Sequence, residues 1–371
     1  MKIFNSAIFL VFITITACES EDSEPSKATD LAELPEITVN RTLEISESEE
    51  FRPGIINALE VDSRGNIMVG DRQQNTITIF DDQGNYLQTL GRVGSGPGEF
   101  RDLMSVSLNP DSDTLFSYDS DQKRITRFLP DEEGIWKYES TIKMNGELSY
   151  AISNLLPLRD GKLVIKPMDT SYMLHHEDAE DLPLLLFSDG GQILNDELIR
   201  IPFADIKVER ITGGMRSFTI PFGRSVIVRQ GSGDYIYHAW NDQPKINKTD
   251  IDGQTSEVTN FPVSNPLVTA GESDEILDSP MRQNLSASDI PGTKPALNNF
   301  LVDEANRIWA NINTEAEEEY NWILFNKNGD PEGGFNLPPE FRFSSVRNGK
   351  LYGYQQAGGN SLIIAGYSVD L

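Results

Sequence analysis

The sequence has few of the residues that form covalent cross-links or metal sites. Among 371 residues it contains one cysteine, Cys18, and three histidines, His175, His176 and His238. One cysteine excludes an internal disulfide framework and any cysteine-rich zinc site. His175 and His176 are adjacent, so on a strand they would point to opposite faces, and we expect them in a solvated loop. We expect His238 to pack within a strand, and we expect no multi-histidine metal centre.

Basic residues are also scarce. The chain has 31 Lys and Arg against 58 Asp and Glu, a formal net charge of −27. Nucleic acids bind basic faces through their phosphates, so the charge argues against a nucleic-acid partner. Hydrophobic residues make up 38% of the chain, which argues against bulk disorder. The length allows one large all-β domain or two ordinary domains.

Residues 3–17 form an apolar segment after Lys2 that fits a secretory signal and is too short to span a bilayer comfortably. It ends in the letters ITAC, at residues 15–18. This ending resembles the lipobox of bacterial lipoproteins, where the chain is cut before a lipid-carrying cysteine. The resemblance implies that residues 1–17 are a signal peptide and that Cys18 is lipidated, which would hold the protein on a membrane. An ordinary signal peptide with an incidental cysteine is the alternative.

Residues 18–35 begin with the acidic run ESEDSE and predict a disordered, self-repelling tether. The run is similar to the acidic tract that sends Bacteroidota-type lipoproteins to the cell surface. We therefore expect an outer-membrane lipoprotein of the bacterial cell envelope. The rest of the chain would be displayed on the surface, or it would face the periplasm if the run is only a linker.

Short alternating runs between Gly, Asp and Asn turns follow from residue 36 and indicate an all-β fold. The clearest unit runs from Ile55 to Gly91. It predicts four strands, at 58–62, 67–71, 76–80 and 86–90, joined by turns that favour positive backbone φ.

The string LEVDSRGNIMVGDRQQNTITIFDDQGNYLQTLGRVGSGPGEF, from residue 59, resembles the NHL-repeat family of β-propellers. The similarity is strong over residues 55–130 and fainter elsewhere, and it implies an NHL-like or TolB-like propeller. Gly91–Gly98 then forms the turn between two blades. It is not a phosphate-binding loop, because no Gly-Lys-Ser/Thr and no helix follow it.

Five further units fit the same template. The six units are 55–91, 100–143, 150–203, 218–263, 296–337 and 343–368. The sixth has three strands, and the segment Glu36–Ile45 can supply the fourth and close the ring. Residues 36–371 thus predict a six-bladed propeller with four-stranded antiparallel blades; two β-sandwiches are the rival fold. Residues 264–295 lack a strand pattern and are expected to be irregular, with a short acidic helix near Glu272–Gln283.

In a propeller, the loops that enter the blades and the loops between second and third strands share one face around the channel. Arginines on that face could bind a carboxylate or phosphate group, or each could pair with a nearby carboxylate and hold a loop. The sequence predicts ligand-binding residues there at Arg72, Arg101, Arg216, Trp240 and Arg342. Asp242 falls in the same loop as Trp240.

Asn109–Asp113 has alternating oxygen ligands that could hold calcium. It lacks the later glycine and the bidentate glutamate of a calcium loop, so a plain turn is favoured. The sequence contains no Gly-x-Ser-x-Gly elbow and no His-Glu-x-x-His motif. We therefore expect no catalytic residue, no bound metal and no cofactor, with calcium as the alternative.

Two functions remain open. The first is a non-enzymatic binding module, anchored to the membrane through its lipid. Its partner would be a small ligand, a glycan, a peptide or an envelope protein at the channel mouth. The second is a calcium-dependent propeller hydrolase, lactonase or lyase, because propellers that look alike include such enzymes. We expect a monomer in either case.

Overall fold

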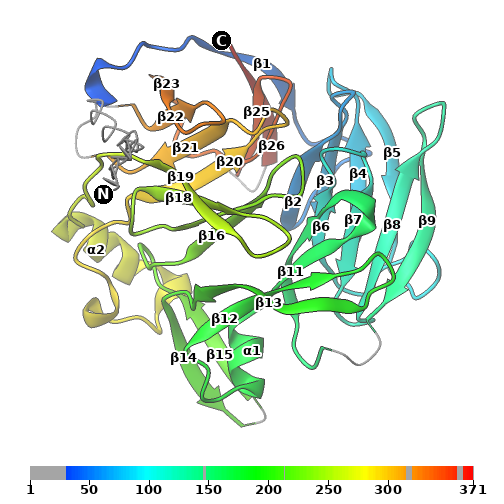
Figure 1. Ribbon diagram of the computed structural model, residues 1–371, viewed down its shortest axis with the longest axis horizontal. Helices are drawn as coiled ribbons and strands as arrows, with labels where there is room; N and C mark the ends of the chain where they lie inside the picture. The colour runs from blue at the N-terminus through cyan, green and yellow to red at the C-terminus, as the bar shows by residue number, and fades with distance from the viewer. Residues whose placement is uncertain (1–30, 145–147, 213, 315–319, 357–361, 371) are drawn as a thin grey trace, which may run out of the picture.

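The computed structural model of the protein describes residues 31–144, 148–212, 214–314, 320–356 and 362–370. Six four-stranded antiparallel sheets follow one another along the chain and around a ring (Figure 1). The predicted all-β six-bladed propeller is therefore confirmed. In the described ranges, no helix has the length and apolar character needed to span a membrane.

The strands of each blade follow in chain order. Blade 1 contains β2 (Ile56–Val61), β3 (Ile67–Asp71), β4 (Thr76–Phe80) and β5 (Tyr86–Leu90). Blade 2 contains β6 (Leu103–Leu108), β7 (Leu115–Asp119), β8 (Arg124–Pro130) and β9 (Trp136–Lys143). Blade 3 contains β10 (Ile152–Pro157), β11 (Leu163–Pro167), β12 (Asp181–Phe187) and β13 (Ile193–Pro202).

The second half of the ring repeats this arrangement. Blade 4 contains β16 (Val226–Gln230), β17 (Ile236–Trp240), β18 (Lys245–Thr249) and β19 (Thr255–Asn260). Blade 5 contains β20 (Leu297–Val302), β21 (Ile308–Ile312), β22 (Trp322–Phe325) and β23 (Pro331–Phe335). Blade 6 contains β24 (Arg342–Arg347), β25 (Lys350–Gln356), β26 (Leu362–Val369) and β1 (Val39–Ile45). Short 3-10 helices lie at Leu31–Glu33, Arg159–Gly161, Pro280–Arg282 and Ala287–Asp289.

The turns explain why the sequence breaks into such short strands. Asp62 accepts hydrogen bonds from the backbone N–H of Arg64 at 2.9 Å and of Asn66 at 2.8 Å. Gly65 between them has a φ of 88°, which a side chain would disfavour. The same geometry recurs at Asp81. Each Asp-x-x-Gly-Asn sequence therefore reverses the chain locally.

The first strand of each blade is the innermost one. The first strands of neighbouring blades contact one another around the ring, so they surround the central channel. Apolar side chains fill the space between neighbouring sheets; Trp309 and Phe335 of blade 5, for example, share a buried cluster with Leu351 of blade 6. The channel-facing residues are thus held by packed walls.

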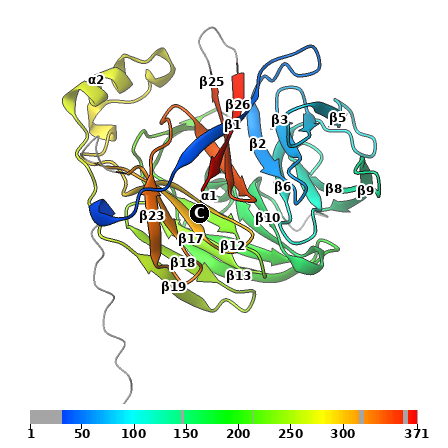
Figure 2. The same ribbon diagram turned by 90° about the horizontal axis from the view of Figure 1, so that it is seen from above.

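The two ends of the described chain close the ring. Strand β1 pairs antiparallel with β26, with Val39 opposite Val369 and Ile45 opposite Ile364. Figures 1 and 2 show the blue β1 beside the red β25 and β26. The predicted closure by the N-terminal segment is confirmed, and it covers an edge that β26 would otherwise expose.

Two expectations are wrong in detail. Residues 215–218 do not form the loop that enters blade 4, because a separate hairpin, β14 (Ile206–Ile211) and β15 (Gly214–Thr219), lies between blades 3 and 4. The segment that contains His175 is not a loop but the helix α1 (Asp169–His175). Tyr172 of this helix is buried against Tyr150, with ring centroids 5.1 Å apart. That tertiary contact has no local signature in the sequence.

The region 264–295 contains the helix α2 (Ala270–Asp278), which lies at the periphery in both views (Figures 1 and 2). Thr269 and Glu272 form a capping box at its first turn. The helix begins two residues before the predicted start, and a 3-10 turn follows it.

Candidate functional site

The central channel encloses a cavity of about 280 Å³. All six inner strands line it, so residues far apart in the sequence meet there. Five charged residues are among those that line it, and two of them lie on the inner strands of opposite blades: Glu60 on β2 and Arg229 on β16. Both side chains border the cavity and are half-buried.

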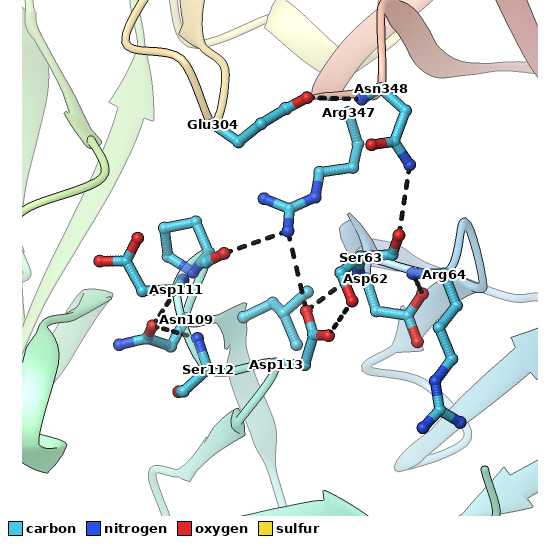
Figure 3. Close-up of polar contacts among 12 residues, drawn as sticks. Asp62, Ser63, Arg64, Asn109, Asp111, Ser112, Asp113, Glu304, Arg347 and Asn348 are labelled. Atoms are coloured by element: carbon cyan, nitrogen blue, oxygen red, sulfur yellow. Dashed lines mark hydrogen bonds and ion pairs between the residues drawn. The ribbon is translucent and has the colours of Figure 1, made fainter.

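A belt of polar contacts links the blades at one end of the channel, at the loops that follow the inner strands (Figure 3). Asp113 of blade 2 accepts hydrogen bonds from the backbone and hydroxyl of Ser63 in blade 1. Arg347 of blade 6 lies 3.9 Å from Asp113. The backbone N–H of Asn348 donates to Glu304 of blade 5 at 3.1 Å, and its amide donates to the carbonyl of Ser63 at 3.4 Å.

The belt continues through the other blades. Arg159 of blade 3 donates to Asp111 of blade 2 at 3.0 Å, and its backbone N–H donates to Asp234 of blade 4 at 2.7 Å. Asn306 of blade 5 donates to the carbonyl of Ser232 in blade 4 at 3.1 Å. Each blade is thus linked to the next, and several belt residues form the floor of the channel cavity.

The opposite face, here the entrance face, carries the loops that lead into the inner strands. A cleft of about 580 Å³ lies on it over blades 5 and 6. We call it the amide cleft because five asparagines line it: Asn298, Asn299, Asn311, Asn313 and Asn321. Arg229 lines both the amide cleft and the channel cavity, so the two spaces meet at its side chain.

Reciprocal hydrogen bonds hold the cleft amides in place. Asn298 and Asn313 donate to each other at 2.9 and 2.8 Å. Asn321 donates to the carbonyl of Leu337 and accepts from its N–H, both at 3.0 Å. Since an amide has two N–H donors and two acceptor lone pairs, these contacts leave capacity for a ligand.

Arg342, the first residue of β24, is exposed at the rim of the amide cleft. Among the described residues it forms no ion pair. Phe341 and Phe343 on either side of it are buried and also line the cleft. The cleft therefore combines fixed amides, aromatic surface and one guanidinium that pairs with no carboxylate of the described residues.

Two of the other predicted arginines, Arg72 and Arg101, are ion-paired. Arg72 binds Asp102 through two hydrogen bonds, at 2.8 and 3.1 Å, which raise the pKa of Arg72 and lower that of Asp102. Arg101 donates to Asp121 at 3.2 Å. Both arginines lie at the loops of blades 1 and 2, across the ring from blade 5. They line neither the channel cavity nor the amide cleft.

The remaining predicted residues lie elsewhere. Arg216 is exposed on β15, opposite Glu209 in the hairpin outside the blades. Trp240 is the last residue of β17, half-buried and opposite Val226. Cys18 lies outside the described residues. Of the five residues predicted to bind ligand, only Arg342 borders the amide cleft, and none lines the channel cavity.

The described residues contain no group of three His, Cys, Asp or Glu side chains placed to hold a metal ion. Asn109 in the predicted alternative calcium loop accepts hydrogen bonds from the backbone of Asp111 and Ser112. Buried His238 donates to or accepts from Thr249 at 3.0 Å, and burial lowers its pKa to about 4.

Sequence reasoning missed Glu60, Arg229 and the amide cleft. In alternating strands, Glu60 and Arg229 look like residues on a solvent face. The available signal was their position, because the first strand of a blade has neighbours on both faces. The letters from Asn298 to Asn321 contain five cleft asparagines within 24 residues, which is a second signal.

Residues 27–181 match the model of the family DUF5128, described as "6-bladed beta-propeller". No curated protein matches the chain. A Bacteroides fragilis protein that carries the description of an exported protein shares 13% identity. The match covers 90% of this chain and 96% of that one, with a TM-score of 0.55.

A member of the DUF4221 family from Bacteroides vulgatus shares 10% identity over 90% of this chain and 99% of that one, with a TM-score of 0.52. Virginiamycin B lyase from Staphylococcus aureus shares 12% identity over 90% and 99%, with a TM-score of 0.45. At such identities a shared fold does not indicate a shared activity. The comparisons and the sheet topology together identify the chain as a six-bladed β-propeller.

Proposed function

We propose that this protein is a lipid-anchored lipoprotein of the bacterial cell envelope whose propeller binds an acidic glycan in the amide cleft, without catalysing a reaction. The observation that carries the proposal is the cleft itself, with its hydrogen-bonded amides and, at its rim, Arg342, which forms no ion pair with a described residue. The protein acts as a monomer. It does not bind nucleic acid, since its net charge is −27.

The chemistry of the cleft favours a hydroxyl-rich ligand with an acidic group. Amide groups both donate and accept hydrogen bonds, as sugar hydroxyls do. A guanidinium binds a carboxylate through two parallel hydrogen bonds. A peptide, a different small anion or an envelope protein is the alternative occupant of the cleft.

Substituting Arg342 tests this site. Arg342→Ala should weaken binding of oligogalacturonate roughly tenfold or more, because a charge-assisted hydrogen bond contributes about 1.5–3 kcal/mol. Binding of neutral galacto-oligosaccharides should change little. Isothermal titration calorimetry on a chain that starts at residue 31 measures both.

Arg101→Ala is the matched control, since Arg101 is an exposed arginine of the same face that pairs with Asp121. It should leave the affinity within about twofold. Equal affinities for Arg342→Ala and the unsubstituted chain would remove the amide cleft as the binding site. A response to peptides alone would redirect the proposal to a protein partner.

The proposed anchor has its own test. Cys18→Ser should abolish incorporation of a fatty-acid analogue in bacteria, because the thiol is the attachment atom. Ser20→Ala should be labelled like the unsubstituted protein. Mass spectrometry should place the mature N-terminus at residue 18; an unlabelled protein cut elsewhere would leave an ordinary signal peptide.

The calcium-dependent hydrolase, lactonase or lyase remains the alternative. Calcium should not raise the unfolding midpoint if the protein is a metal-free binder. A rise that chelator reverses would favour the alternative, because a ligand specific to the folded state stabilises it by mass action. Assays on lactones and esters would then follow.

A further inference from the structure

The channel cavity holds charged groups that the amide cleft does not use. Inner strands have one edge turned toward the channel, so unpaired backbone groups and polar side chains face the cavity. At about 280 Å³ it could hold on the order of nine waters. It is also near the lower limit of volumes that bind small molecules. The question is which occupant its charges favour.

Arg229 is the first of these groups. Its guanidinium donates to the carbonyls of Phe300 at 3.0 Å and Val228 at 2.9 Å, and to the side-chain oxygen of Asn299 at 2.5 Å. These bonds use three of its five N–H donors and leave two. Among the described residues it forms no ion pair, so no described carboxylate neutralises this half-buried charge by direct contact.

Glu60 faces the same cavity from the other side of the ring. Its carboxyl forms no hydrogen bond or ion pair with a described residue. Burial raises its pKa to about 8, against the attraction of Arg229, so the carboxyl is mostly protonated at neutral pH. Burial lowers the pKa of Arg229 to about 10, against the attraction of Glu60, so Arg229 stays charged there.

The other charged groups of the cavity have partners. Arg347 donates to the carbonyl of Pro110 at 3.1 Å and lies near Asp113. Glu304 accepts from Asn348. Asp303, which also lines the cavity, accepts hydrogen bonds from the side chains of Arg307 and Trp309. Glu304 Oε2 and Arg347 Nε have no hydrogen-bond partner among the described residues, but another contact in the belt holds each of these side chains. Arg229 forms no ion pair with a described residue and Glu60 no hydrogen bond with one, so we assign these two groups to an occupant.

We propose that the channel cavity is a second binding site, for a small organic anion whose carboxylate lies between the side chains of Arg229 and Glu60. The guanidinium supplies the opposite charge and two free N–H donors. The protonated carboxyl of Glu60 donates an O–H···O⁻ hydrogen bond, which is among the stronger kinds. Because the cavity meets the amide cleft at Arg229, the anion enters from the entrance face, past that side chain.

The proposal predicts a specific pH dependence. Binding needs the protonated form of Glu60, so affinity should fall as pH rises through about 8. For a group that titrates there, the loss between pH 7 and pH 9 is about tenfold. Glu60→Gln keeps a neutral donor at all pH values, so it should bind as tightly at pH 9 as at pH 7.

The experiment is calorimetric titration of the chain with monomeric glucuronate, and with glucose as the neutral match. Arg342→Ala serves as the background, so that the amide cleft binds acidic ligands only weakly. We expect binding of glucuronate but not of glucose, the tenfold loss at pH 9, and its absence in Glu60→Gln. Arg229→Met should remove binding at both pH values.

Three outcomes would overturn the proposal. Equal binding of glucose would show that no anion is recognised, and loss at pH 9 in Glu60→Gln would place the titrating group elsewhere. Absence of glucuronate binding would mean that the cavity holds water only. Because Glu60 lines the channel cavity and not the amide cleft, the Glu60→Gln pH profile separates a failure of this site from a failure of the cleft. If Arg229→Met does not fold, the Glu60→Gln pH profile still decides.

Discussion

Deleting residues 31–46 should lower the thermal unfolding midpoint far more than any single surface substitution. The deletion removes β1, whose Leu43 and Ile45 are buried against blades 6 and 1. Burying each such side chain contributes about 1.5–3 kcal/mol, and the lost ladder bonds to β26 add about 1 kcal/mol each. We expect a total of at least ~5 kcal/mol, or on the order of 10 °C.

A chain that starts at residue 31 is the control and should unfold at the midpoint of the full chain. Circular dichroism during heating measures both. The shortened chain should also self-associate, because β26 then has a free edge that can pair with another molecule. An unchanged midpoint would show that the ring does not depend on this strand. Leu43→Ala alone should cost about 2–4 kcal/mol.

Replacing Asp303 by alanine should destabilise the protein much more than the same change at Asp81. Asp303 is fully buried and accepts hydrogen bonds from two backbone N–H groups, from the Arg307 guanidinium and from the Trp309 ring N–H at 3.0 Å. Alanine leaves these buried donors unpaired and removes the counter-charge of Arg307. We expect about 3–5 kcal/mol.

Asp81 is the matched control because it makes the same turn, accepting from Gln83 at 3.0 Å and Asn85 at 2.8 Å. Its turn is open to water, so Asp81→Ala should cost about 1 kcal/mol. Urea unfolding at neutral pH measures both values. Equal losses would mean that burial does not set the contribution of these turns.

The turn chemistry and the strand pattern were local properties, and the sequence alone determined them. Gly65 follows Asp62 at the spacing that a tight turn requires. In the strands before and after this turn, apolar residues alternate with polar ones. The sixth predicted unit had three strands where the others had four, and the segment Glu36–Ile45 belonged to no unit. Because an uncovered edge is unfavourable, the ring closure followed from the count.

Only the tertiary structure decided the site. Glu60 and Arg229 face one cavity although 169 positions separate them in the chain, and no spacing encodes which inner strands lie across a ring. Arg72 and Arg342 had the same local appearance, yet one meets Asp102 and the other borders the amide cleft. The sequence of the hairpin β14–β15 also has no local feature that distinguishes its two strands from strands of a blade. A repeat pattern fixes each blade, whereas closing six blades into a ring fixes which side chains meet.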